Sequence, residues 1–506
     1  MSLNWLAELR RAATLMVQPE KPIAKAPTVW RSIQAIVFAS WLNALLIFIP
    51  ISWAMNFALP DQHTLTFVFA FLAIIPLTKL LAFATDELSL RVGQTLAGLL
   101  NATLGNAVEL IVSIIALAKC QLTIVQSSLV GSILSNLLLV LGMCFFAGGL
   151  RFSEQGFGQS AVQLNLSLLT ISVIAVLLPG AFHMALQGQP GYDELSIDYN
   201  ILQTSRGVAI ILLFIYASYL VFQLFSHKAL YDDDNENMQP TKAYAGQNPF
   251  RLHRRRRIIT DGENVSSPSS THDREAAATL SCPADANPDV EPGTYSIASV
   301  ETEIQPLMNI AVCFWLLAVV AVLTTVTAVF LVDSIDGLTS SGSINKEFVG
   351  VILLPIVGHA ADHVIEVTVS VKDKLTLSLG VAVGSSIQIA LFVIPFIVTL
   401  GWIMDKPLTL LFDPLESIVM FLSVLTVNYV VQDGKSNWLE GMILMCAYMI
   451  LAVTFWYYPG EPLVDVAEDS HMLNNGLTRH PRDLSKLLDL GIFDERRIAT
   501  GSVLLG

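Results

Sequence analysis

Two acidic residues, Glu109 and Asp362, stand in apolar sequence at matching places in two similar segments. Residues 105–109 read GNAVE and residues 358–362 read GHAAD. An ionised carboxylate in hydrocarbon costs at least about 2.5 to 3.5 kcal/mol for Asp on insertion scales, so each acid should face protein, water or an ion. Two carboxylates that converge without a cation repel each other and hold a proton, which a divalent cation displaces. Such a pair would couple ion binding to proton release.

The two acids belong to an internal repeat. Gly131 and Ser132 follow the first segment at the same offset, without a gap, as Gly384 and Ser385 follow the second. Chance seldom keeps two motifs in register, so the chain contains two related halves.

Calcium prefers about six to eight oxygen ligands, which two carboxylates alone cannot supply. Backbone carbonyls freed by Gly105 and Gly358 are candidates for the remaining ligands. The candidate side chains are those of Asn106, Ser132, Ser135, Ser385 and Gln388. A structural alternative stays open for each of them, because polar side chains join helices and small residues let helices approach closely. Helix packing alone would not require an acid at both Glu109 and Asp362, so this alternative leaves the paired acids unexplained.

Four further polar residues accompany the repeats. Asp86 and Glu87 end the second apolar stretch, where they form the mouth of an ion route or are ordinary interfacial charges. Glu366 is four residues beyond Asp362 and shares its helix face, which makes it a candidate second acid on a proton path. His363 could shuttle protons or hydrogen-bond a neighbouring helix.

The composition requires a membrane protein. The chain has 506 residues, of which 53% are hydrophobic and 14% charged, and its mean hydropathy is +0.60. An ordinary soluble protein is less apolar. Most of the formal charge of −14 lies outside the apolar stretches, and we expect membrane lipid but no nucleic acid as a partner. The five cysteines form no C-x-x-C pair, so neither a disulfide framework nor a zinc knuckle is indicated.

Apolar windows predict an all-α polytopic fold with about eleven transmembrane helices. The predicted spans are Ile33 to Phe57, Leu65 to Ala84, Thr95 to Ala118, Thr123 to Leu150, Ala161 to Ala181, Gly207 to Phe225, Leu307 to Val332, Phe348 to Val371, Leu375 to Ile403, Leu408 to Val431 and Trp438 to Tyr458. The first apolar run comes only after Arg31, so we expect no cleaved signal peptide.

The predicted spans divide the chain into six parts. These are an N-terminal arm (1–32), a first transmembrane helix (33–59), a first five-helix half (60–227), a linker (228–306), a second five-helix half (307–459) and a tail (460–506). The two motif copies open the third and eighth spans, so five crossings separate them and the halves have inverted topology. Such repeats place a substrate site near the midplane and support alternating access.

Lysine and arginine cluster in the arm and in the linker, which predicts that both are cytosolic. The linker combines an acidic run at 232–236, a basic run at 254–257 and a Ser/Pro-rich stretch at 266–270, a composition typical of disorder. The basic run either meets anionic lipid or only enforces topology.

Seven segments resemble the cation/proton exchanger family, the vacuolar calcium/proton antiporters of fungi and plants, within the calcium/cation antiporter superfamily. They are ATDEL (84–88), GLLNAT (98–103), GNAVEL (105–110), GSILSN (131–136), LPIVG (354–358), VGSSIQIA (383–390) and DGKSNWLEG (433–441). The resemblance implies a vacuolar membrane protein that uses proton flow from an acidic lumen to load calcium. It also implies that Glu109 and Asp362 are the central ion-binding acids, with Asp86 and Glu366 along the pathway.

The second repeat departs from the family pattern, which reads GNAAEH where this chain has GHAADH at 358–363. Asp362 is one methylene shorter than glutamate. His359 replaces an amide oxygen with an imidazole nitrogen, which suits manganese and zinc better than calcium. We therefore expect transported Ca²⁺ or Mn²⁺ together with H⁺, and no cofactor. The acidic run at 232–236 resembles in position the family's acidic helix, a cytosolic calcium-sensing surface, and a solvated disordered run fits equally.

Rival interpretations come from other classes. His359 and His363 stand at i and i+4 with Asp362 between them, a spacing that an intramembrane metalloprotease could use to bind a metal. The usual glutamate general base is absent, however, and no third ligand is evident. A transport-deficient or altered-specificity homologue that acts as a sensor or scaffold is a second rival, and a passive channel is a third. We expect a transporter rather than an enzyme, and an oligomer is compatible with the sequence.

Overall fold

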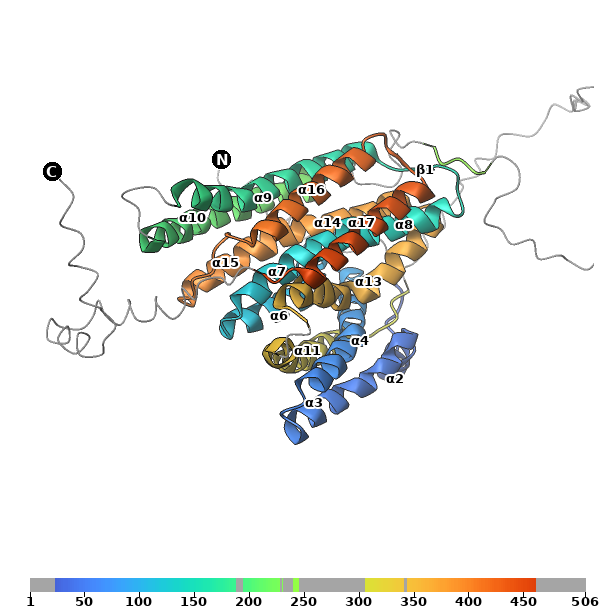
Figure 1. The fold of residues 1–506 in the computed structure, drawn as a ribbon. Coiled ribbons are helices and arrows are strands. Elements are labelled where there is room, and N and C mark those ends of the chain that lie inside the picture. Colours follow the sequence, from blue (N-terminus) through green and yellow to red (C-terminus); the bar gives the residue numbers. More distant parts are fainter. Residues whose placement is uncertain are drawn as a thin grey trace, which may run out of the picture.

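The computed structural model describes residues 23–187, 194–227, 230, 240–244, 305–340 and 344–460, without the side chains of residues 94, 95, 102, 194, 195, 361 and 362. These residues form a bundle of long helices (Figure 1). Apolar sequence favours helices here because a helix satisfies its backbone hydrogen bonds internally, which lipid cannot do.

Before the first half come α2 (Val29–Val37), the 3₁₀ turn η1 (Trp41–Ile47) and α3 (Phe48–Ala58). The first half contains α4 (His63–Ser89), α5 (Gln94–Leu104), α6 (Ala107–Ala118), α7 (Leu122–Leu134), the π-helical turn η2 (Ser135–Val140), α8 (Leu141–Gly149), β1 (Gln155–Gly156), α9 (Gln159–Leu186), α10 (Glu194–Val221) and the π-helical turn η3 (Phe222–Ser226). The second half contains α11 (Ile310–Ser340), α12 (Lys346–Phe348), the π-helical turn η5 (Val349–Leu353), α13 (Leu354–Val371), α14 (Leu375–Gln388), the π-helical turn η6 (Ile389–Val393), α15 (Ile394–Ile403), α16 (Pro414–Val430), β2 (Lys435–Ser436) and α17 (Trp438–Tyr457).

Among the described residues, 8 helices are long and apolar enough to cross a membrane, and a bent pair, Lys346–Ala360 with His363–Val371, makes a ninth. Two shorter apolar helices, Ala107–Ala118 and Pro414–Val430, add to these. Each predicted span coincides with helix over most of its length, so the all-α membrane fold is confirmed. The count of eleven spans stays a prediction.

Several predicted spans differ from the helices in detail; the sixth, for example, begins at Glu194 and not at Gly207. The first is interrupted at residues 38–40, so α2 is a separate helix that starts before the predicted boundary. The tenth begins at Pro414 and not at Leu408, because Asp413 caps the helix there and its side chain accepts the N–H groups of Leu415 and Glu416.

The two halves are inverted relative to each other, as their first helices show. The start of α11 lies at the end of α4, where the Glu87 carboxylate accepts the backbone N–H of Leu307 at 3.1 Å. At the other end, His63 at the start of α4 lies against Gly337 near the end of α11. The two helices therefore run antiparallel through the core of the bundle.

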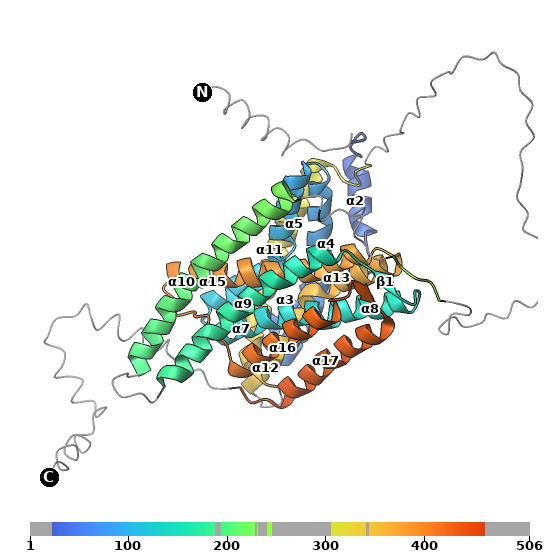
Figure 2. The ribbon, with the colours of Figure 1, turned by 90° about the horizontal axis from the view of Figure 1, so that it is seen from above.

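Packing between the halves repeats the same symmetry. Helix α10 packs on α15 of the second half, and its counterpart α17 packs on α8 of the first half. The counterparts α9 and α16 pack on each other. Figure 1 shows α9, α10 and α16 on the opposite side of the bundle from α3, α4 and α11, and Figure 2 shows α9 and α10 side by side.

Helix α3 lies outside this symmetry, as expected for the first span. It packs on α4 and α11, where the Trp53 indole N–H donates to the Thr327 hydroxyl at 3.3 Å. The ring of Phe330 meets the rings of Trp53 and Phe57 edge-on.

A short sheet joins the halves at one end of the bundle. Strands β1 and β2 pair antiparallel, and Lys242 forms a bridge with Glu154 beside them. The rest of the predicted linker lies outside the described residues, apart from 230, 240–241, 243–244 and the residues that lead into α11. The acidic and basic runs, most of the N-terminal arm and the tail after 460 also lie outside them.

Candidate ion-binding site

Glu109 lies in the first turn of α6, next to a break in the membrane helix. Gly105 and Asn106 separate α5 from α6, which places the first motif in the middle of the third span rather than at its opening. The N–H groups at a helix start carry partial positive charge and favour a carboxylate there. The Glu109 residue is only 9% exposed.

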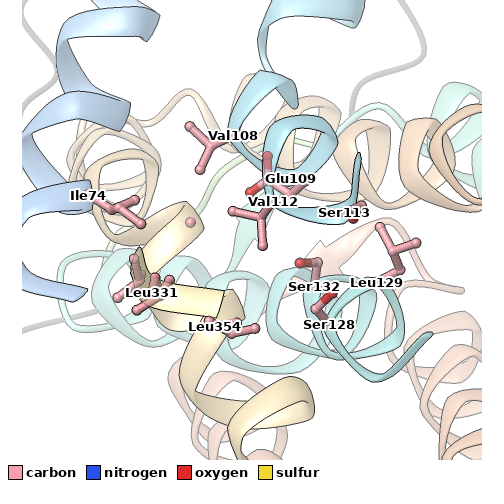
Figure 3. A pocket seen from close by; sticks show the side chains of 12 residues that line it. Ile74, Val108, Glu109, Val112, Ser113, Ser128, Leu129, Ser132, Leu331 and Leu354 are labelled. Carbon is pink, nitrogen blue, oxygen red and sulfur yellow. The ribbon is translucent and has the colours of Figure 1, made fainter. Parts of the chain in front are cut away.

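A small cavity lies beside the Glu109 carboxylate (Figure 3). Its volume is about 30 Å³, enough for one or two water molecules or for a cation with part of its hydration shell. Ser113, Ser128 and Ser132 contribute hydroxyl groups to a lining that is otherwise mostly apolar. The cavity therefore offers one acid and several neutral oxygens, which is a donor set for a hard cation.

His359 of the second half lies next to Glu109. Its Nδ1 atom lies 3.1 Å from the Pro355 carbonyl oxygen, and its Nε2 atom lies 3.4 Å from Oε1 of Glu109. A carbonyl can only accept, so the contact with Pro355 places a proton on Nδ1. Within the described residues, neither Nε2 of His359 nor Oε1 of Glu109 has a hydrogen-bond partner.

Gly358 allows this close approach of the two repeats. A Cβ atom at position 358 would lie 2.5 Å from Oε1 of Glu109, closer than van der Waals contact allows. A larger residue at position 358 would therefore displace the Glu109 carboxylate from its place against α13. Gly131 serves the same purpose one helix away, since a Cβ there would collide with the Val351 backbone.

Amide and hydroxyl side chains connect the two halves next to Glu109. The Asn106 amide donates to Oε1 of Gln388 at 2.5 Å, and the Ser385 hydroxyl donates to Oδ1 of Asn106 at 3.0 Å. The Asn136 amide donates to the Ser385 hydroxyl at 3.1 Å. Three predicted ligand residues are thus brought together, and they fix the broken helix to α14.

π-Helical turns follow both copies of the Gly-Ser motif. Ser135 opens η2, and its repeat partner Gln388 immediately precedes η6. Such turns widen a helix by one residue and are frequent at functional sites. Ser135 is fully buried, beside Tyr448 of α17.

The second acid of the predicted pair, Asp362, lies on α13, and its side chain is outside the described set. The helix pieces before and after it meet at 64°. The ring of His363 is parallel to that of His359, with centroids 6.3 Å apart. Glu366, one turn further, is 6% exposed. The meeting of Glu109 with Asp362 stays a prediction, as do the roles of His363 and Glu366.

Asp86 and Glu87 have different surroundings although they are adjacent. Asp86 is exposed, whereas Glu87 is 3% exposed and accepts the backbone N–H groups of Leu307 and Met308. Arg91 lies 3.7 Å from the Glu87 carboxylate. These contacts give Glu87 a structural role, while the place of either residue on an ion route stays a prediction.

Three polar residues at the site were not among the predicted ligands. Asn136 directly follows Ser135 in the GSILSN motif, and Ser128 precedes Ser132 by four residues and so shares its helix face. Both residues could have been predicted from these sequence positions. Ser113 follows Glu109 by four residues on α6 and could have been found in the same way.

Comparison with known proteins identifies the family. The model of the sodium/calcium exchanger protein family matches residues 62–225 and 312–457, so the chain belongs to that family. A vacuolar calcium ion transporter of Cryptococcus neoformans var. grubii is 50% identical over 90% of this chain and 79% of its own length. A vacuolar calcium ion transporter of Schizosaccharomyces pombe is 38% identical over 84% and 87%, and a Ca²⁺/H⁺ antiporter of Synechocystis is 37% identical over 82% and 96%.

Solved structures agree with the fold. The Ca²⁺/H⁺ antiporter protein YfkE matches with a TM-score of 0.57 and 26% identity over 82% of this chain and 98% of that chain. The H⁺/Ca²⁺ exchanger CAX has the same fold at a TM-score of 0.52 and 10% identity, covering 83% and 92%. The resemblance drawn from the motifs is therefore confirmed.

Proposed function

We propose that this chain is a secondary active antiporter that exchanges Ca²⁺ for H⁺ across a vacuolar membrane. The observation that carries the proposal is the Glu109 carboxylate, buried in mid-membrane beside a small cavity with hydroxyl groups. The names of the relatives from two fungi and a cyanobacterium support calcium as the cation and protons as the counter-ion. Removal of the cation from the cytosol follows if the arm and linker are cytosolic.

The coupling follows from competition at Glu109. Without a cation, the carboxylate holds a proton in common with His359, whose Nε2 atom is 3.4 Å away. A divalent cation in the cavity takes the same oxygen atoms and displaces the proton. Asp362 supplies the second charge in this proposal, and Ser132 and Ser135 supply neutral oxygens. Either the cation or protons occupy the site, so each flow drives the other.

Alternating access requires the two halves to rock around this fixed site. Asn106, Ser385 and Gln388 link α14 to the break at α5 and α6. These hydrogen bonds hold the site together while α4 and α11 move relative to it.

The cation preference depends on His359. Its imidazole replaces an oxygen donor, and transition metals such as Mn²⁺ accept nitrogen more readily than Ca²⁺ does. We therefore propose that Mn²⁺ competes with Ca²⁺ for transport.

No described observation favours the rival functions. The two ring nitrogens of His359 face Pro355 and Glu109, and no three His, Cys, Asp or Glu side chains within the described set are grouped to hold a metal. A protease would cleave membrane peptides, and a sensor or scaffold would leave Ca²⁺ on one side.

Reconstituted vesicles with an imposed pH gradient test the proposal. We expect Ca²⁺ uptake that depends on the gradient, with protons moving the opposite way, and competition by Mn²⁺. Collapse of the gradient by an ionophore should stop net uptake. Inert vesicles, or uptake that ignores the gradient, would contradict antiport.

A further inference from the structure

A second buried acid, Glu416, lies away from the Glu109 cavity and has no place in the mechanism above. It occupies the first turn of α16, at the end of the bundle opposite the β1–β2 sheet. The residue is 1% exposed, its carboxylate faces the Ser127 hydroxyl, and within the described part of the chain it forms no ion pair. A buried carboxylate with no positive charge beside it needs a neutralising ligand.

Other acids surround Glu416 instead of bases. Asp413, which begins α16, accepts the N–H groups of Leu415 and Glu416 and the hydroxyl of Tyr458. Glu347, in the first turn of α12, is 6% exposed and adds a further negative charge to the field at Glu416. The neighbouring Lys346 points away, into an ion pair with Asp336.

The neutralising ligand is a proton rather than a metal. Glu347, Asp413 and Glu416 interact through their charges, but within the described residues they do not form a group that could hold a metal ion. Asp413 already uses both of its oxygens on helix N–H groups and on Tyr458. A single carboxyl group in apolar surroundings is most stable with its own proton.

Helix α7 connects this acid with the ion cavity. The Ser127 side chain faces Glu416, and the next residue, Ser128, lines the cavity beside Glu109. Ser127 is itself 1% exposed, and it also packs against Gly350, next to the α12 segment that carries Glu347. Two adjacent serines thus separate the two buried acids.

We propose that Glu416 is a second proton site of the exchanger, which receives protons through Glu347 from the compartment at this end and delivers them along α7 to the Glu109 cavity. The inference rests on the proposed antiport and adds an entry point for its protons. If the arm and linker are cytosolic, this end faces the acidic lumen, which is where the driving protons come from.

Glu416→Gln tests the proposal, because glutamine keeps the shape of the protonated acid but cannot release a proton. The variant is measured in reconstituted vesicles in two modes: Ca²⁺ uptake driven by a pH gradient, and exchange of labelled Ca²⁺ for Ca²⁺ without a gradient. We expect gradient-driven uptake to fall by about 100-fold, the usual order for loss of a proton-transferring group, while Ca²⁺/Ca²⁺ exchange is unchanged. Asp333→Asn, an exposed carboxylate at the same end, is the matched control and should leave both modes unchanged.

Each other result overturns the inference. Wild-type rates in both modes would give Glu416 no role in proton transfer, and loss of both modes in a folded variant would make it part of the cation route. Failure of wild-type vesicles to take up Ca²⁺ would instead refute the antiport itself.

Should Glu416→Gln not fold, infrared spectra of the wild type and Glu416→Asp replace it. The expected result is a carbonyl band of a protonated carboxyl group at neutral pH that changes position in Glu416→Asp. An identical band in both proteins, or none, would contradict the proposal.

Discussion

Asn106 and His359 occupy equivalent positions in the two repeats but make different contacts at the site. Asn106 reaches across to the other half and is held by Ser385 and Gln388. His359 has no such contact with the equivalent residues of the first half, Ser132 and Ser135; its ring nitrogens face Pro355 and Glu109. The first half-site is therefore tied by hydrogen bonds, whereas the second presents a nitrogen atom to the acid.

The difference assigns a structural role to Asn106 and a chemical role to His359. Side chains that are already hydrogen-bonded across the halves keep the broken helix in place and change little when a cation enters. A histidine that touches the acid but is not hydrogen-bonded to Ser132 or Ser135 can change its protonation and its partner. Ion preference should therefore depend on His359, and stability on Asn106 and its partners.

Loss of the acid itself is the largest expected effect. Glu109→Gln should weaken Ca²⁺ binding by at least about 100-fold, since removal of one member of a buried charged site costs roughly 3 kcal/mol. Gradient-driven Ca²⁺ uptake, measured as a function of Ca²⁺ concentration, gives this loss of affinity. The exposed Asp61→Asn serves as the control, and near-normal affinity in Glu109→Gln would remove the acid from the site.

His359→Asn makes the two copies alike and should change selectivity. We expect competition by Mn²⁺ against Ca²⁺ uptake to weaken by about tenfold, because a nitrogen donor is replaced by an amide oxygen that suits calcium. Uptake of Ca²⁺ at increasing Mn²⁺ concentration measures how strongly Mn²⁺ competes in the wild type and in the variant. Unchanged competition would show that His359 does not face the cation.

Ser385→Ala and Ser132→Ala change repeat-related residues with different expected roles, the first in stability and the second in Ca²⁺ binding. Ser385 takes part in two hydrogen bonds, so its loss should lower the free energy of unfolding by about 1 to 3 kcal/mol. Ser132 faces the cavity, and its loss should weaken Ca²⁺ binding more than it lowers the melting temperature. Thermal unfolding and Ca²⁺ titration of both variants decide the matter. Equal effects on both quantities would contradict the division of roles.

The smallest expected effect lies at the sheet that joins the halves. A hydrogen bond from Lys242, and then its charge, hold the pKa of Glu154 below its ordinary value of 4.5. A lowered pKa in the folded state stabilises the protein above the ordinary value and loses that effect as the pH falls through the folded value. Lys242→Ala should therefore lower the melting temperature slightly at neutral pH and not in strong acid. High salt should reduce the difference, and a loss independent of pH and salt would point to packing instead.

The fold was largely predictable because its signals are long. Each apolar stretch of about 20 residues specifies a membrane helix by length alone. The two motifs in register, at Gly105 and Gly358, then fixed the inverted arrangement that α4 and α11 show. The hydrogen bonds of Asn106, Ser385 and Gln388 bring three of the predicted ligands together, and their role as ligands stays a prediction.

Local breaks and contacts were less predictable. The interruption of the first span at residues 38–40 contains no proline, and nothing in its apolarity separates it from continuous helix. The contact of Glu87 with Leu307 joins residues far apart in sequence, and so does that of Glu416 with Ser127. Such pairs depend on how helices rotate against one another, which periodicity does not specify.

Proton release on calcium binding tests the central claim most directly. Titration calorimetry of the purified protein with Ca²⁺, in two buffers of different ionisation heat, gives the number of protons released per ion bound. The account predicts release from the wild type and a smaller release from Glu109→Gln at saturating Ca²⁺. Calcium binding without proton release, or the same release from both proteins, would contradict it.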